Sequence, residues 1–461
     1  MAMTDVGDDS KAGQASRKGI WGWMLFDWAN QPFQTLIVTF VFGPYFVARV
    51  VGDPVAGQAH WATATAIGGA AVAVLAPLLG AVADRTGARK RWIAAFSLPF
   101  VIGCAGLWIA APEASPLWPI LAFFVLAYVG SEFTLIFSNA MLPGLGPRRE
   151  IGRISGSGWA LGYAGGLVAL ALVLALLTPA PGGTRTLAGL DPVFGLSDAL
   201  GEPARAVGPA SALWYLVFAL PLFLFAPDTA PAARLGAAAR EGLRDLLATL
   251  RQIRRFRGFF TYLLASMVYR DALAGLFAFG GIYAAGVLGW GMFELGLFGI
   301  VAAGAGALGA WLGGRADRAF GPRPVIVAAI WMLIGVGLLA LMTTRESVLG
   351  MPVPPGSRLP DQVFFFAGAV LGAGSGILQA ASRTLLVHLA EGRVASAQAF
   401  GLYAVSGKVT AFAAPALIAV VTAATGSQRL GFSPVIALFL IGLLLLYWAK
   451  SEYEQPGDLP A

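Results

Sequence analysis

The chain contains the sequence GAVADRTGARK at residues 80–90, directly after a long apolar run, and GGRADRAFGPR at residues 313–323, after another. Both segments present Gly, Asp, Arg, Gly and a basic residue in the same order, roughly half a chain apart. A repeat of this kind is typical of membrane proteins built from two related halves. We therefore expect a duplicated architecture in which each segment joins two membrane-spanning helices.

The amino-acid composition of the chain indicates a protein that is embedded in a lipid bilayer. Of the 461 residues, 57% are hydrophobic and 12% are charged, and the mean hydropathy is +0.74. A soluble domain carries about 25% charged residues. We expect an all-α membrane protein with about twelve spans of about 20 residues each, in two pseudo-symmetric six-helix bundles. The spans are predicted near residues 21–49, 61–83, 92–111, 117–142, 154–178, 207–226, 259–288, 292–313, 324–343, 362–385, 396–424 and 432–449.

A basic segment divides the predicted spans into two groups. Between Arg234 and Arg257 the leucines recur at roughly helical spacing, at 243, 246, 247 and 250, followed by Ile253. This pattern favours an amphipathic helix on the inner membrane face, and a basic tether that only follows the charge rule is the alternative. The predicted organisation is a tail (1–20), an N-terminal bundle (21–226), this linker (227–258), a C-terminal bundle (259–449) and a second tail (450–461).

The distribution of basic residues predicts the orientation. Most of the 31 Lys and Arg residues fall in loops on the side of the N-terminus, which indicates that both termini are cytoplasmic. Arg greatly outnumbers Lys, and Ala, Gly and Pro are common, so we expect a bacterial protein of the inner membrane. This topology accounts for the net charge of +7 without nucleic acid. Cys104 is the single cysteine, so an internal disulfide is excluded. No phosphate loop, metal-ligand spacing or catalytic triad pattern is present. We expect no enzyme activity and no cofactor, and a monomer.

Both repeated segments resemble motif A of the major facilitator superfamily. Four further segments resemble its vacuole-effluxer-like branch, whose bacterial members are called the unknown major facilitator family. These are FDWAN at 26–30, SGSGWALGYAGG at 155–166, YRD at 269–271 and GILQAASR at 376–383. Ala272 departs from the pattern, which has Gly at that position. The resemblance implies the major facilitator fold and alternating access, and the fungal relatives are associated with release of amino acids from vacuoles.

The repeated segments predict a charge latch between the halves that stabilises one facing state. Glycines allow tight turns and close helix contacts, and an Asp at the end of a span can cap or pair with a neighbour. Simple inner-loop topology is the alternative explanation of the basic residues. The predicted latch residues are Gly80, Asp84, Arg85, Gly87, Arg89, Lys90, Gly313, Asp317 and Arg318.

Charged residues inside the predicted spans indicate a path for solute. Each costs about 3 kcal/mol on insertion scales, so such residues are functional candidates. The alternative is that they pair with one another and only hold helices together. Asp271 and Lys408 lie at similar depth and could form such a pair. The predicted substrate or coupling residues are Asp27, Asn30, Glu132, Tyr163, Tyr269, Arg270, Asp271, Gln379, Arg383 and Lys408.

These residues, together with what the resemblance implies, favour a secondary transporter of small polar metabolites, with amino-acid efflux as the first hypothesis. A carboxylate of Asp27, Glu132 or Asp271 would meet an ammonium group or carry a coupling proton. Arg270, Lys408 or Arg383 would meet a carboxylate. Efflux of amphipathic drugs or lipids is the second hypothesis. A membrane receptor or scaffold that transports nothing and uses the basic linker is the third.

Overall fold

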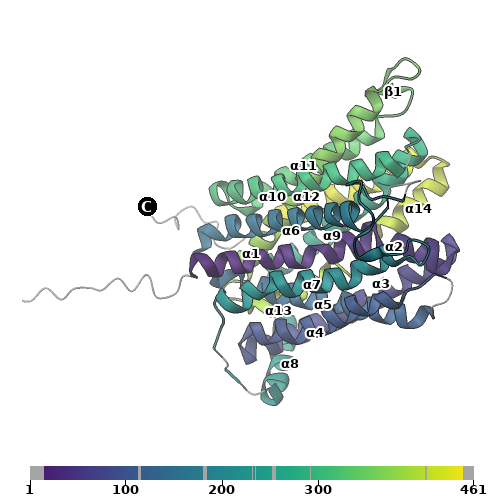
Figure 1. The fold of residues 1–461 in the computed structure, drawn as a ribbon. Coiled ribbons are helices and arrows are strands. Elements are labelled where there is room, and N and C mark those ends of the chain that lie inside the picture. Colours follow the sequence, from purple (N-terminus) through teal and green to yellow (C-terminus); the bar gives the residue numbers. More distant parts are fainter. Residues whose placement is uncertain are drawn as a thin grey trace, which may run out of the picture.

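The computed structural model describes residues 15–449 apart from 113–115, 180–183, 231, 234, 252–255, 291, 411 and 412. Long helices run side by side through the molecule (Figure 1). They are α1 (Arg17–Pro32), α3 (Pro54–Thr86), α4 (Arg89–Gly106), α5 (Leu117–Ala140), α6 (Arg148–Leu176), α7 (Glu202–Phe225), α9 (Arg257–Leu288), α10 (Met292–Phe320), α11 (Pro322–Leu341), α12 (Leu359–Ala390), α13 (Ser396–Ser406), α14 (Ala413–Thr425) and α16 (Ser433–Trp448).

The helices confirm the membrane-spanning architecture. Within the described residues, 10 helical stretches are long and apolar enough to cross a bilayer, and α9, with 32 residues, is also long enough. Each matches a predicted span. The sixth predicted span contains Pro209 and Pro221, and α7 runs through both.

Two predicted spans are less regular than expected. The first predicted span is a single helical stretch from Arg17 to Val51, but it is not a regular α-helix throughout. After α1 it continues through the π-helical η2 (Phe33–Phe40), the short α2 (Phe42–Tyr45) and the π-helical η3 (Phe46–Val51). The span predicted at 396–424 is not one helix. Residues 407–410 form a turn between α13 and α14, and this turn places the polar Lys408 inside the bundle.

The two ends of the bundle differ. Residues 80–90 and 313–323 lie at one end, which we call the motif end. A small antiparallel hairpin, β1 (Ser347–Val348) with β2 (Met351–Pro352), lies at the other, which we call the hairpin end. The linker helix α8 (Leu235–Arg251) packs against α3 outside the bundle (Figure 1). The remaining short helices are η4 (Leu107–Ile109), η5 (Leu142–Gly144), η6 (Val193–Gly195) and α15 (Gln428–Gly431).

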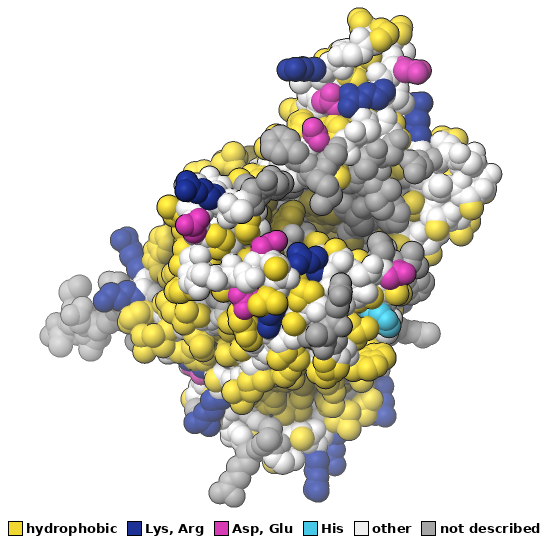
Figure 2. All heavy atoms as spheres, turned by 45° about the vertical axis from the view of Figure 1, so that its right-hand side comes forward, with side chains coloured by type: hydrophobic (Ala, Val, Ile, Leu, Met, Phe, Trp, Pro, Cys, Tyr) yellow, Lys and Arg dark blue, Asp and Glu magenta, His cyan; other side chains and the backbone are white. Residues whose placement is uncertain are grey.

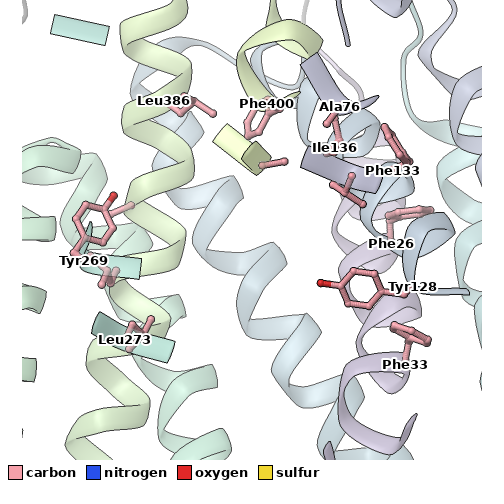
Figure 3. Packing of buried hydrophobic residues seen from close by; sticks show 14 of the residues in the cluster. Phe26, Phe33, Ala76, Tyr128, Phe133, Ile136, Tyr269, Leu273, Leu386 and Phe400 are labelled. Atoms are coloured by element: carbon pink, nitrogen blue, oxygen red, sulfur yellow. The ribbon is translucent and has the colours of Figure 1, made fainter. Parts of the chain in front are cut away.

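The buried side chains form a core in each half, and others lie in the interface between the two halves. We call this interface the seam. Figure 3 shows Phe26, Phe33 and Phe133 gathered in the N-terminal half and Tyr269 on the other side of the view. Ring stacking is close in the N-terminal half, where Phe96 and Phe133 have centroids 4.4 Å apart. Across the seam, α13 packs on α3 and α5, and α10 packs on α6. Residues from both halves therefore face each other along the length of the bundle.

Candidate functional site

The first repeated segment contacts the opposite half through Asp84. Its Oδ1 accepts a hydrogen bond from the Ala397 backbone N–H at 3.0 Å, and its Oδ2 accepts one from Gln398 at 2.8 Å. Both donors belong to the first turn of α13, where free N–H groups and the helix dipole favour a carboxylate. Arg89 lies 3.4 Å from the same carboxylate. Asp84 therefore caps a helix across the seam.

The other basic residues of this segment hold the linker and their own half. Arg85 forms an ion pair with Asp245 of α8. Lys90 Nζ donates to the Phe223 carbonyl at 2.9 Å. Gly87 has a φ of +64°, and this left-handed conformation makes the turn into α4. Only some of the predicted latch residues in this segment therefore contact the opposite half. Arg85 and Lys90 do not.

The second segment makes the corresponding contacts with α6. Asp317 packs on Gly152, where a Cβ atom would lie 2.4 Å from the Asp317 Cγ. Arg318 Nη2 lies 2.7 Å from Glu150 Oε1. Gly313 instead packs on Ile377 of α12 in its own half. Each copy of the motif therefore provides a contact between the halves at the motif end.

Asp27 and Arg383 meet at the centre of the seam. Asp27 lies on α1 and Arg383 on α12, 356 positions apart, and Arg383 Nη1 donates to Asp27 Oδ2 at 3.1 Å. Their side chains are 8% and 4% exposed, so both charges are buried. A buried charge is tolerated when it is paired and hydrogen-bonded. The sequence predicted both residues as candidates but did not predict their pairing.

The guanidinium of Arg383 also binds groups that the sequence prediction did not include as site residues. Nε donates to Ser155 Oγ at 2.9 Å, Nη2 donates to the Ser155 carbonyl at 2.7 Å, and Nη1 donates to Asn139 Oδ1 at 2.7 Å. The ring of Trp23 lies 4.9 Å from its Cζ. Ser155 belongs to a segment that carried the family resemblance, whereas no sequence signal indicated Asn139.

A second ion pair crosses the seam between α5 and the turn after α13. Lys408 Nζ lies 2.8 Å from Glu132 Oε1 and donates to Tyr128 Oη at 2.6 Å. Both charged side chains are about one-fifth exposed, at 21% and 19%. The expected pairing of Lys408 with Asp271 is wrong. Tyr128 lies one helical turn before Glu132, so the spacing of four residues could have revealed it.

The remaining charged candidates serve contacts within the C-terminal half. Asp271 Oδ2 accepts from the Ala414 backbone N–H at 2.9 Å and so caps α14. Arg270 Nη1 donates to the Tyr403 carbonyl at 3.0 Å, and its Cζ lies 4.3 Å from the Tyr403 ring centroid. The hydroxyl of Tyr269 lies 2.8 Å from Ser382 Oγ. These three side chains therefore join helices of one half.

Asn30 likewise joins helices of the N-terminal half. Its Nδ2 donates to Thr134 Oγ1 at 3.1 Å, and its Oδ1 accepts from Ser131 Oγ at 2.7 Å. The side chain is 3% exposed. These bonds fix α1 against α5, and Asn30 is therefore placed away from the seam contacts of Asp27.

Tyr163 and Gln379 form a polar layer across the seam next to a cavity. Gln379 Nε2 donates to Tyr163 Oη at 3.0 Å and to Ser375 Oγ at 3.1 Å. Tyr163 also lines a cavity of about 540 Å³. Figure 2 shows the surface hollowed at the hairpin end. The described lining residues are uncharged: Gln31, Gln34, Thr35, Thr39, Phe40, Tyr163, Leu167, Leu170, Phe277, Leu295, Phe298, Gly299, Ile300, Ala302 and Ala303.

The cavity lies one helical turn from the central ion pair. Gln31 of the lining is four residues after Asp27 on the same helix, and Gln379 is four residues before Arg383. Four residues advance a helix by about 6 Å. The order along the seam is thus the cavity, the Tyr163 and Gln379 layer, the ion pair and finally the contacts at the motif end.

Comparison with solved structures supports the fold. The chain aligns with the E. coli fucose:proton symporter FucP with a TM-score of 0.67 at 13% identity, covering 94% of this chain and 98% of that one. It aligns with the human organic anion transporter MFSD10 with a TM-score of 0.66 at 16% identity, covering 93% and 99%. Both have the major facilitator fold, and identities this low show the fold alone.

Comparison of sequences is more specific. The chain is 24% identical over 448 residues to the uncharacterized MFS-type transporter YxiO of Bacillus subtilis, covering 95% of this chain and 97% of YxiO. It is 26% identical over 260 residues to Autophagy-related protein 22 of Botryotinia fuckeliana, covering 52% of this chain but 38% of that protein. Residues 147–455 match the family described as vacuole effluxer Atg22 like. The chain is therefore a multi-pass secondary transporter of the major facilitator superfamily and belongs to the vacuole effluxer Atg22-like family.

Proposed function

We propose that the protein exports small zwitterionic metabolites, amino acids foremost, by alternating access, with a proton as the coupling ion. The carrying observation is that two ion pairs, Asp27–Arg383 and Glu132–Lys408, each join one half to the other. In the arrangement described here the halves touch at the motif end, while the cavity lies toward the hairpin end. This is the geometry of one facing state.

The ion pairs explain why a zwitterion suits this seam. When the halves separate, a buried pair breaks, and each unpaired charge costs several kcal/mol. A zwitterion offers an ammonium group to Asp27 and a carboxylate to Arg383, so it can replace the pair without leaving either charge unmatched. Binding energy from the solute would thereby support the change of state. The description of the family as an effluxer supports the outward direction.

The cavity lining favours a second candidate. Phe40, Phe277 and Phe298 contribute to a wall that is mainly apolar. An amino acid would place its side chain there and its charged groups toward Asp27 and Arg383. An amphipathic compound without a carboxylate would use the wall alone. The two candidates therefore differ in their need for Arg383.

Counterflow into proteoliposomes tests the substrate. We expect vesicles loaded with an amino acid to accumulate the same labelled amino acid, and the Arg383→Gln variant to lose this exchange. Arg358→Gln is the matched control, because Arg358 is exposed at the start of α12, and it should exchange normally. Exchange of amphipathic cations but no amino acid, unaltered in Arg383→Gln, would instead favour the second candidate.

Glu132 is the proposed site of the coupling proton. Its pairing with Lys408 ends when the halves part at this level, and the carboxylate then becomes the proton acceptor. We expect Glu132→Gln to retain exchange at equal pH on both sides but to lose the acceleration caused by a pH gradient. Asp271→Asn should keep that acceleration, because Asp271 caps a helix within one half. An unchanged response to the gradient in Glu132→Gln would remove Glu132 from this role.

A further inference from the structure

The linker helix α8 has one face buried against the transporter. Ala238 is fully buried and Leu246 is 9% exposed. Gly242, between them on the same face, approaches α3 so closely that a Cβ atom would lie 2.9 Å from the Val82 backbone nitrogen. Val82 lies about one turn before the end of α3 at Thr86. Since α3 spans the membrane, α8 lies at the depth where the hydrocarbon core meets the headgroups.

Two further faces of α8 carry exposed side chains. Successive residues turn by about 100°, so Leu243, Leu247 and Leu250 form one stripe beside the buried face, and each is 41–46% exposed. Three exposed arginines, Arg240, Arg244 and Arg251, form the adjoining stripe. A leucine stripe next to an arginine stripe at interface depth is complementary to acyl chains and anionic headgroups, respectively.

Contacts of α8 reach the cross-seam cap at the motif end. Arg85 of the first repeated segment lies 3.3 Å from Glu241 and pairs with Asp245. Thr249 Oγ1 accepts from Gln398 Nε2 at 3.2 Å, and the backbone N–H of Gln398 is one of the two that Asp84 caps. Asp245 and Thr249 lie on the same side of α8 as Gly242, so α8 touches both halves.

We propose that α8 is a binding site for anionic phospholipid and that lipid bound there stabilises the arrangement in which the halves touch at the motif end. Acyl chains cover the leucine stripe and phosphate groups bind the arginine stripe. The lipid holds α8 against α3 and so keeps Thr249 in place beside α13. Lipid binding stands on its own, whereas its effect on the motif end rests on the alternating access proposed above.

Nitroxide labels test the docking directly. Cys104 is buried, so labels can be placed at Leu247→Cys and at Ala248→Cys. Ala248 is exposed and lies outside the leucine stripe, about 100° around the helix from Leu247. In vesicles containing phosphatidylglycerol we expect the label at 247 to collide mainly with oxygen, which concentrates in lipid, and the label at 248 mainly with a water-soluble nickel complex. Equal exposure of both labels to nickel would overturn the docking.

The effect on the motif end is measured by the distance between labels on the two halves, at Arg91→Cys and Ala319→Cys, both exposed. Adding phosphatidylglycerol to phosphatidylcholine nanodiscs should increase the fraction of protein molecules in which the labels at residues 91 and 319 are close together. The triple variant R240Q/R244Q/R251Q should lose this increase, since each arginine near an anionic surface contributes roughly a fivefold factor in affinity.

A second triple variant, R149Q/R257Q/R315Q, removes the same charge from exposed arginines elsewhere on the protein and should keep the increase. If both triple variants lose it equally, the lipid acts on overall charge and the α8 site is refuted. If neither loses it, α8 is not the binding site. The collision measurements do not depend on transport, so they separate failure of the lipid site from failure of the proposed function.

Discussion

Replacing Arg383 with Met should abolish transport and destabilise the protein by about 3–5 kcal/mol, the usual cost of breaking a buried ion pair by removing one partner. The change leaves the Asp27 carboxylate buried without its cation and takes a donor from Asn139 and from Ser155. Asp27→Asn should cost less, because the guanidinium keeps those acceptors. Thermal unfolding of the purified variants, together with counterflow, measures both effects.

A double-mutant cycle distinguishes the ion pair from general damage to the seam. If the unpaired carboxylate is the main source of the cost, Asp27→Asn combined with Arg383→Met should be more stable than Arg383→Met alone. The exposed Arg358→Met serves as the control and should unfold like the wild type. Strictly additive effects of the two substitutions would show that the pairing seen at 3.1 Å contributes no coupling.

Most of the fold follows from residue order alone, because a span needs only a sufficient run of apolar residues. The places where a span departs from a regular helix could not be predicted in this way. The turn at 407–410 falls inside an apolar stretch, and averaging over a window hides one Gly407-Lys408 step. The hairpin turn at Leu349 and Gly350, both with positive φ, uses a leucine where asparagine or aspartate is usual, so the Asn-Gly or Asp-Gly pair that indicates such a turn was absent.

The site was predicted as a set of residues but not as a set of contacts. Asp27 and Arg383 stood out because a charge in a span is costly. Their pairing depends on how α1 and α12 cross at the seam, 356 positions apart, which no local pattern encodes. The same limit explains why Lys408 was matched with Asp271 by depth and is found with Glu132. The depth of a residue in the membrane limits which residues it can pair with, and the rotation of each helix about its axis determines which of them it meets.

Replacing Gly80 with Val should move the protein out of the arrangement described here. A Cβ atom at residue 80 would lie 2.4 Å from the Ala397 carbonyl oxygen and 2.8 Å from the carbonyl carbon. Both are backbone atoms at the start of α13, so neither can turn aside. Overpacking of this kind costs about 1–3 kcal/mol, which corresponds to a shift of roughly 5- to 150-fold in the ratio of the two facing states. Separation of α3 from α13 relieves the clash.

Distances between nitroxide labels on the two halves measure this shift. At the motif end, labels at Arg91→Cys and Ala319→Cys should move apart. At the hairpin end, labels at Gln58→Cys and Leu359→Cys, also exposed, should approach each other, as alternating access requires. Gly335→Val is the matched control, because a Cβ atom there has nothing within 4 Å, and it should leave both distances unchanged.

A variant without any clash separates loss of the motif-end contact from simple misfolding. Asp84→Asn removes the negative charge from the α13 N-terminus while keeping the size of the side chain, so it should shift both distances in the same direction as Gly80→Val but less far. If Gly80→Val and Asp84→Asn both fold and leave the distances as they are, the contacts at the motif end do not select the facing state. If in both variants the labels move apart at the motif end and approach each other at the hairpin end, then the Asp84 carboxylate and the close contact at Gly80 both help to select the facing state.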